Sequence, residues 1–132
     1  MQTEQMEPRP RVFLLKYGSP SWAIARATFA TNFFASGGYE IIESAEIYSI
    51  KDGVDIALEI NPEVVVLCSS NEEYVRMPPD VLTLLVQQSL VIVAGDPKEI
   101  GEHLQKLGIS HYIHRKSPLM KTLQVINSIV LK

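Results

Sequence analysis

Short apolar runs alternate along the chain with segments that carry signals for the start and the end of a helix. Apolar or mostly apolar runs predict five strands, at residues 12–17, 39–42, 64–68, 90–94 and 112–113. Apolar residues at consecutive positions are typical of parallel strands that are covered on both faces. The run at 64–68 is the strongest of these predictions, because it is entirely apolar and rich in β-branched residues.

Helix signals fill the intervals between these strands. Ser19-Pro20 supplies an N-cap and a first-turn proline, and Gly37-Gly38 marks the end of that helix after Ser36. Further helices are predicted over residues 49–60 and 81–88, from Asp96-Pro97 to Gly108, and from Ser117-Pro118 to the end of the chain.

Five strands that alternate with five helices predict an α/β fold built on a doubly wound parallel sheet. Because crossover connections are right-handed, the leading topology is the flavodoxin-like (Rossmann-like) strand order 2-1-3-4-5. A chain of 132 residues with 46% hydrophobic residues is long enough to bury one core. We interpret residues 11–132 as that domain and residues 1–10, which include two prolines, as a flexible leader or linker.

Charge and cysteine content limit the partners and the cellular compartment that we expect for the protein. The net charge of -3 gives no electrostatic reason to expect nucleic acid or an anionic membrane as a partner. The apolar runs are far shorter than the roughly 20 residues of a membrane helix, and the first ten residues contain no secretory signal. The single cysteine, Cys68, excludes an internal disulfide and fits a reducing compartment, so we expect the cytoplasm.

Ligands of an open parallel sheet bind at the carboxyl ends of the strands. The loops to examine are therefore residues 18–25, 69–73, 95–96 and 114–117, which we expect at one edge of the sheet. The first loop contains no acid and no histidine, and Ser19 is expected to cap the following helix rather than to hold a phosphate. A Gly-x-Gly-x-x-Gly turn for a dinucleotide is absent.

A phosphate-accepting receiver site is also missing its residues. Such a site needs an aspartate at the end of the third strand and an acidic pair after the first. Cys68-Ser69 stands at the first of these places and Lys16-Tyr17 at the second. No catalytic residue is predicted.

The three histidines do not predict a metal site. His103 is expected at the surface of an amphipathic helix, and His111 and His114 fall on opposite faces of a strand. Cys68 is expected to be a buried strand residue rather than a nucleophile, because burial raises the pKa of a thiol.

Three stretches together resemble the cobalamin-binding domain of acyl-CoA mutases: Lys16-Tyr17-Gly18, residues 29–33 and residues 37–41. The resemblance extends over about residues 9–131, and Gly95-Asp96-Pro97 fits the same pattern. Cobalamin binders of this family carry Asp-x-His-x-x-Gly in the first loop. In them the histidine is the lower axial ligand of cobalt, and the aspartate orients it.

Carried over to this sequence, the three motif positions hold Pro20, Trp22 and Ala25. An indole nitrogen has no lone pair to offer a metal, and a proline cannot replace a carboxylate. The resemblance therefore implies a degenerate site that binds no cofactor. It also implies that Trp22 and Phe29 fill the groove in which the cofactor would lie.

The run Leu67-Cys68-Ser69-Ser70, with Tyr74 after it, resembles the small subunit of heterodimeric methylmalonyl-CoA mutases, whose carboxyl-terminal domain lacks the histidine motif. This resemblance implies a large catalytic subunit as the partner. That subunit would hold adenosylcobalamin and isomerise methylmalonyl-CoA and succinyl-CoA. It implies a non-catalytic, structural role in the heterodimer for the present domain.

Two other interpretations remain open from the residues. The chain could be a cobalamin carrier that binds without a protein histidine, in a residual groove lined by Ser69, Ser70 and Gly95. It could also be a free-standing regulatory module of the same fold that takes an unidentified small ligand.

Overall fold

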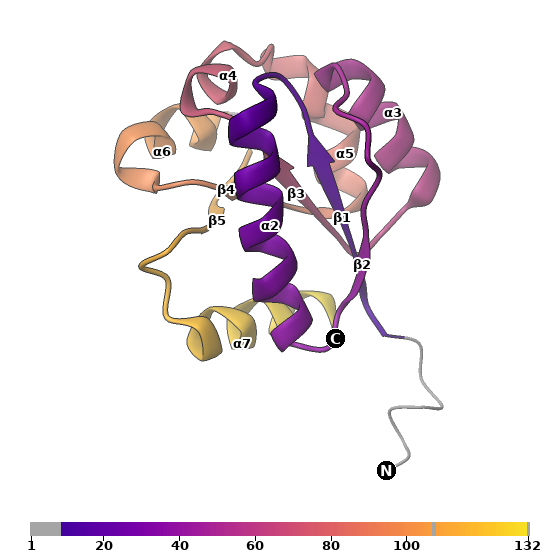
Figure 1. The fold of residues 1–132 in the computed structure, drawn as a ribbon, viewed down its shortest axis with the longest axis vertical. Coiled ribbons are helices and arrows are strands. Elements are labelled where there is room, and N and C mark those ends of the chain that lie inside the picture. The colour runs from indigo at the N-terminus through magenta and orange to yellow at the C-terminus, as the bar shows by residue number, and fades with distance from the viewer. Residues whose placement is uncertain (1–8, 107, 132) are drawn as a thin grey trace.

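A parallel five-stranded sheet forms the centre of the computed structural model, which describes residues 9–106 and 108–131 (Figure 1). The strand order is β2-β1-β3-β4-β5. The predicted flavodoxin-like order is therefore confirmed. Of the predicted leader, residues 1–10, the first eight lie outside the described residues.

The five strands lie close to their predicted positions. They are β1 (Arg11–Lys16), β2 (Glu40–Ile42), β3 (Val64–Cys68), β4 (Leu90–Ala94) and β5 (His111–Ile113). β1 and β3 are neighbours at the centre, in a register that pairs Val12 with Val64 and Lys16 with Cys68. Every side chain of β3 is buried, because helices cover both faces of the sheet, and this explains its unbroken apolar run.

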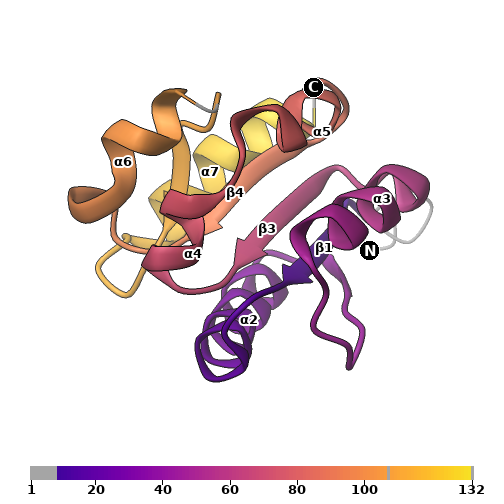
Figure 2. The same cartoon turned by 90° about the horizontal axis from the view of Figure 1, so that it is seen from above.

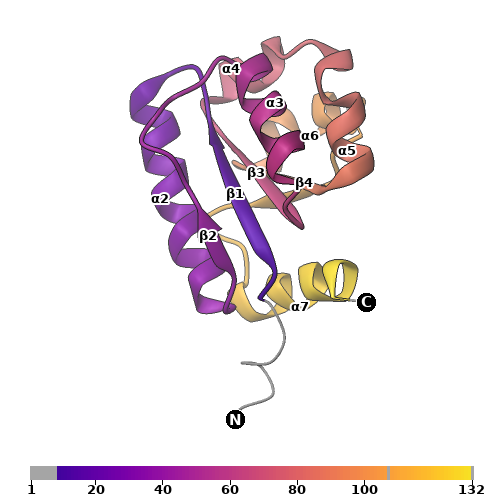
Figure 3. The same ribbon diagram turned by 90° about the vertical axis from the view of Figure 1, so that its right-hand side faces the viewer.

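Helices connect the strands and form the two outer layers. They are α2 (Pro20–Ser36), α3 (Ile50–Ile60), α4 (Asn71–Arg76), the 3-10 helix η1 (Pro79–Leu82), α5 (Thr83–Gln88), α6 (Pro97–Lys106) and α7 (Leu119–Val130). α2 and α7 pack on one face, and α3, α4, α5 and α6 pack on the other. Figure 2 and Figure 3 show α2 and α3 on opposite sides of β1.

The face under α2 owes its close packing to small residues of that helix. Ala27 and Ala30 are fully buried against Val12 and Leu14 of β1. Side chains alternate between the two faces along a strand, so Phe13, between them, faces the opposite cluster together with α3. α2 therefore lies close to the sheet along its whole length, which positions its first turns beside the strand ends.

Three local predictions differ from the structure. Residues 71–73, expected to be part of a loop, belong to α4, because Ser70 caps this helix with its Oγ accepting from the Glu73 N–H at 3.2 Å. Ser19 stands at the N-cap position of α2, but its side chain makes no capping hydrogen bond. In addition, the single helix expected over 81–88 is divided into η1 and α5.

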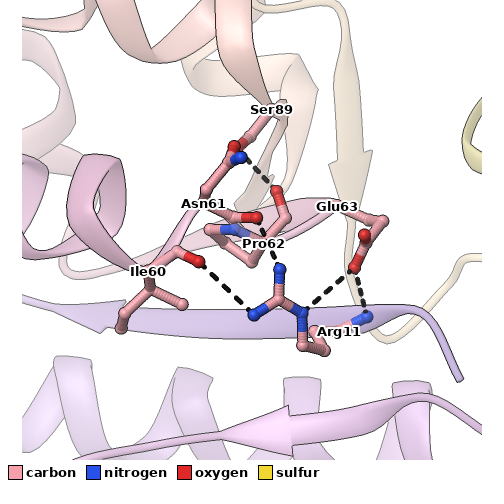
Figure 4. Close-up of polar contacts among 6 residues, drawn as sticks. All are labelled: Arg11, Ile60, Asn61, Pro62, Glu63 and Ser89. Atoms are coloured by element: carbon pink, nitrogen blue, oxygen red, sulfur yellow. Dashed lines mark hydrogen bonds and ion pairs between the residues drawn. The ribbon is translucent and has the colours of Figure 1, made fainter. Parts of the chain in front are cut away.

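Arg11 lies at the edge of the sheet where the amino ends of the strands meet, and it holds this edge together (Figure 4). Its guanidinium donates to the carbonyl oxygens of Asn61 at 2.6 Å and Ile60 at 3.3 Å, and its Nε lies 3.5 Å from Glu63 Oε1. Carbonyls at a helix end lack partners within the helix, so these bonds satisfy the end of α3. The edge with the amino ends of β1 and β3 is thus tied together by one side chain.

Candidate functional site

The loops after β1, β3, β4 and β5 meet at the carboxyl edge of the sheet, because all of the strand pairs are parallel. The strand order reverses between β1 and β3. In an open α/β sheet, the crevice between the two loops at such a point ordinarily binds the ligand.

The crevice between β1 and β3 is closed by direct contact of its two loops. Gly18 has a φ of 74°, and a β-carbon there would lie 2.7 Å from Glu73 Cγ and 2.9 Å from Ser69 Oγ. A side chain at this position would push the loops apart, and the left-handed backbone also favours glycine. Ser69 itself is fully buried, and its hydroxyl has no hydrogen-bond partner among the described residues.

Tyr74 closes the neighbouring crevice, between β3 and β4. Its phenolic oxygen accepts the backbone N–H of Ser69 at 2.9 Å and donates toward the carbonyl oxygens of Ala94 at 2.8 Å and Leu67 at 3.0 Å. Burial raises the pKa of Tyr74, so the phenol keeps the proton that these bonds require. The crevices between β1, β3 and β4 are therefore filled by packed polar groups and do not form an open binding site. Ser69 and Tyr74, which fill them, are called the plug below.

Arg26 connects α2 to this plug. Its Nη1 donates to the Ser69 carbonyl oxygen at 2.7 Å and to Asn71 Oδ1 at 3.0 Å. The guanidinium carbon lies 4.8 Å from the centre of the Trp22 ring and 5.5 Å from that of Tyr74. Arg26 thus interacts with two aromatic rings and holds α2 against the start of α4.

A pocket with a volume of about 520 Å³ lies beside α2, next to the ends of β4 and β5. This volume is within the range of small-molecule sites, roughly 300–1,000 Å³. Its wall combines an apolar side from α2 and the strands with a basic segment after β5. The lining residues are Trp22, Ala25, Arg26, Phe29, Ala94, Gly95, Asp96, Ile113, His114, Arg115 and Lys116.

The pocket brings together three of the six residues expected at the degenerate motif and the residual groove. Trp22, Ala25 and Gly95 line it, whereas Pro20 begins α2 as an exposed residue and is not part of the lining. The expectation that Trp22 and Phe29 fill the groove is wrong. Both lie on the wall and leave the pocket open, and Trp22 is 52% exposed.

The two serines of the postulated residual groove have other positions. Ser69 is buried beside Gly18, and Ser70 caps α4. Neither is among the residues that line the pocket. Of the groove expected for a histidine-independent carrier, the structure therefore brings only Gly95 to the pocket wall.

Arg26 was not singled out from the sequence, and Tyr74 was noted there only as part of the resemblance to the small subunit. Arg26 follows Trp22 by four residues, which places both side chains on one face of a helix, and this spacing is a signal that could have identified it. Tyr74 gave no such signal. Its role depends on α4, whose six residues are too few to show a helical period.

The side chains at the motif positions do not fit a cobalt-ligating site. The place of the axial histidine holds the indole of Trp22, which lies against the Arg26 cation and has no lone pair for a metal. Within residues 9–106 and 108–131, no group of three or more His, Cys, Asp or Glu side chains is placed to hold a metal ion. We therefore derive no chemical step through cobalt in this domain.

Cys68 and His103 are two further candidate side chains, and neither of them lines the pocket. Cys68 is fully buried, as predicted, and burial raises the pKa of its thiol. His103 is only partly exposed, and its Nε2 is buried without a hydrogen-bond partner in the described structure.

The chain has sequence relatives among mutase small subunits. The chain is 36% identical over 96% of its length to the methylmalonyl-CoA mutase small subunit of Porphyromonas gingivalis, of which it covers 20%. It is 34% identical over 71% of its length to a protein of Mycobacterium tuberculosis named as a probable methylmalonyl-CoA mutase small subunit, of which it covers 16%. No protein-family model matches the chain.

Among solved structures, a cobalamin-binding protein from Desulfitobacterium hafniense superimposes with a TM-score of 0.61 at 21% identity. The superposition covers 96% of this chain and 60% of that one. The fold therefore belongs to the flavodoxin-like class that includes this cobalamin-binding protein. Within that class, the chain is homologous to methylmalonyl-CoA mutase small subunits, and it spans about a fifth of the length of the first of these relatives. The resemblance predicted from the sequence is confirmed.

None of the helices in the described part of the chain has both the length and the apolar character required to cross a membrane.

Proposed function

We propose that this chain is a cobalamin-domain-like segment of a methylmalonyl-CoA mutase small subunit and that its role is structural. In this proposal it carries no catalytic residue and binds no cofactor. A large subunit is the partner, holds adenosylcobalamin and isomerises methylmalonyl-CoA and succinyl-CoA in the cytoplasm. The present domain contributes a stable folded surface to the heterodimer.

The observation that carries this proposal is the position of Arg26. Its hydrogen bonds to Ser69 and Asn71 and its contacts with Trp22 and Tyr74 occupy the edge where the first loop of a cobalamin binder would present its histidine. This packing takes the place of a ligand site, because the polar groups there form hydrogen bonds with one another and need no ligand. It supports loss of the cofactor site independently of the missing motif.

A spectroscopic experiment tests the absence of the cofactor. The chain is incubated with hydroxocobalamin, passed through a desalting column and examined in the visible range, with a cobalamin-binding protein treated in parallel. We expect no retained cobalamin and no spectral shift. Retention of one equivalent per chain would overturn this part of the proposal.

A second experiment tests the structural role. The full-length small subunit and a version lacking the segment homologous to this chain are each co-expressed with the large subunit, and heterodimer yield is measured by sedimentation. We expect a lower yield without the segment, because the surface that it contributes is lost. An undiminished yield would contradict a role in assembly.

The pocket beside α2 supports one other candidate, the cobalamin carrier that uses no protein histidine. Gly95, one of the three residues expected to line the residual groove, lies on the wall of this pocket. The same incubation distinguishes the two candidates, since a carrier retains hydroxocobalamin and a degenerate domain does not.

A further inference from the structure

A purely structural role needs no ligand, yet the domain keeps an open pocket beside α2. We propose that this pocket binds a small organic anion with a flat apolar body, the chemistry of an aromatic carboxylate or sulfonate. The inference goes beyond the structural role, because it gives the domain a binding activity of its own.

The apolar part of the pocket suits a flat ring. Trp22, Ala25 and Phe29 are spaced so that they share one face of α2, and all three line the pocket. Across from them, the strand ends contribute Ala94 and Ile113. Since Trp22 is 52% exposed, part of its indole surface is available to stack on a ligand.

The segment after β5 gives the pocket wall two positive charges. Arg115 and Lys116 line the pocket, both are exposed, and neither side chain forms an ion pair or a hydrogen bond with any described residue. The turn that carries them is held in place, because the backbone N–H of His114 donates to Ser117 Oγ at 3.0 Å. Two cations whose side chains form no ion pair or hydrogen bond, on the wall of a largely apolar pocket, favour an anionic ligand.

The carboxylate of Asp96 does not cancel this charge. Its Oδ1 accepts the backbone N–H of Lys98 at 3.0 Å, at the start of α6. This hydrogen bond, with smaller contributions from nearby cations, lowers the pKa of Asp96, so the group is a single negative charge. With Arg26 already bonded to Ser69, the side chains of Arg115 and Lys116 remain to bind the anion.

The volume of the pocket limits the size of the ligand. About 520 Å³ accommodates a molecule of one or two rings with its charged group beside Arg115 and Lys116. The pocket is also separate from the plug of Tyr74 and Ser69, neither of which lines it. Binding therefore requires no opening of the packed edge.

Titration with 8-anilinonaphthalene-1-sulfonate tests the inference, because this probe joins flat rings to a sulfonate. We expect saturable binding of one probe per folded chain, with quenching of Trp22, the single tryptophan of the sequence. The double variant Arg115→Gln/Lys116→Gln is expected to weaken binding about tenfold, because each partly exposed charge contact contributes about threefold or more to the affinity. Trp22→Ala is expected to weaken it by a similar factor.

Matched variants on the other face of the domain serve as controls. Lys51→Gln removes an exposed charge from α3, and Leu84→Ala removes an exposed apolar side chain from α5. Both are expected to bind the probe like the unmodified chain, and circular dichroism verifies that every variant is folded. The uncharged analogue N-phenyl-1-naphthylamine is expected to bind at least about tenfold more weakly.

Three results would overturn the inference: no saturable binding, equal weakening by the control variants, or equal affinity for the uncharged analogue. Displacement of the probe by adenosylcobalamin would also overturn it, because the pocket would then be a cobalamin site. The desalting experiment reports on cofactor retention separately, so failure of the pocket and failure of the structural role are distinguishable.

Discussion

Arg26 of α2 donates a 2.7 Å hydrogen bond to the carbonyl oxygen of Ser69, at the end of β3. The two residues are 43 positions apart in the sequence. The bond attaches the first connecting helix to the central strand at the edge where such folds bind ligands. The charge of the donor strengthens the bond, and the part-buried acceptor has much to lose if the donor is removed.

Replacing Arg26 is therefore expected to destabilise the domain. Arg26→Met keeps the length of the side chain but leaves the Ser69 carbonyl without its donor, and we expect the free energy of unfolding to fall by about 1–3 kcal/mol. Urea denaturation followed by circular dichroism measures the change. Arg115→Met, at an exposed residue without a side-chain partner in the described structure, is the matched control. An equal effect of the two substitutions would contradict the role of Arg26.

The hydroxyl of Tyr74 is expected to be as important as its ring. Tyr74→Phe leaves the Ser69 N–H and the Ala94 carbonyl without their shared partner, and a loss of about 1–3 kcal/mol in the free energy of unfolding is expected. Tyr48→Phe is the control, because the Tyr48 hydroxyl makes no hydrogen bond among the described residues. Urea denaturation compares them, and a Tyr74→Phe chain as stable as the control would show that the plug adds nothing to stability.

Lys16 is a buried cation that depends on one carboxylate. Its side chain is 8% exposed and its Nζ lies 3.1 Å from Glu43 Oε2. Glu43→Ala leaves the ammonium group unpaired, and we expect a loss of about 1–3 kcal/mol, less than for a fully buried pair because Glu43 is itself partly exposed. Adding Lys16→Met is expected to restore stability. Thermal unfolding of the two single variants and the double variant measures these changes in stability. Glu46→Ala is an exposed control from the same loop.

Lack of rescue in the double variant would contradict this explanation. The cost of Glu43→Ala would then come from lost packing in the loop rather than from an unpaired charge.

Alkaline pH is expected to destabilise the fold through its buried tyrosines. Burial, with a smaller contribution from Glu63, raises the pKa of Tyr39 from 10.0 to about 12, and its hydroxyl donates to Asn127 Oδ1 at 2.7 Å. The folded state thus keeps a proton that the unfolded chain loses. The contribution of Tyr39 to stability is complete below pH 10.0 and is lost as the pH rises toward 12. Burial also raises the pKa of Tyr17 and Tyr74, in the same direction.

Urea denaturation at neutral pH and at about pH 11, between the two pKa values of Tyr39, measures this effect. The midpoint is expected to fall at the higher pH, and to fall less in Tyr39→Phe. A midpoint that does not change with pH, or an equal decrease in the variant, would show that Tyr39 ionises alike in both states.

Most of the fold could be predicted from the sequence, and the reason is the buried sheet. Val64–Cys68 is apolar throughout because both of its faces are covered, and a run of that kind has few other places in a soluble domain. Prolines and glycines at the ends of helices, as in Ser19-Pro20 and Gly37, marked the boundaries of α2. α4 was missed because six residues carry too little periodicity.

For the candidate site, only the absence of the cobalamin motif could be predicted from the sequence. Pro20, Trp22 and Ala25 could be compared with a motif, because that comparison needs nothing but position in the chain. What replaces the motif could not be predicted, since Arg26 lies in α2, Ser69 in the loop after β3 and Tyr74 in α4. Whether Trp22 fills a groove or lines one depends on where its side chain is held, and Arg26 holds it.

The sequence by itself determined the order of strands and helices, the topology of the sheet, the family resemblance and the loss of the histidine motif. These follow from local patterns, because burial on both faces and helix-end chemistry leave marks on consecutive residues. Only the tertiary structure decided that the edge between β1 and β4 is closed while a pocket beside α2 stays open. That outcome depends on contacts such as Arg26 with Ser69, which join residues far apart in the chain and leave no periodic pattern in it.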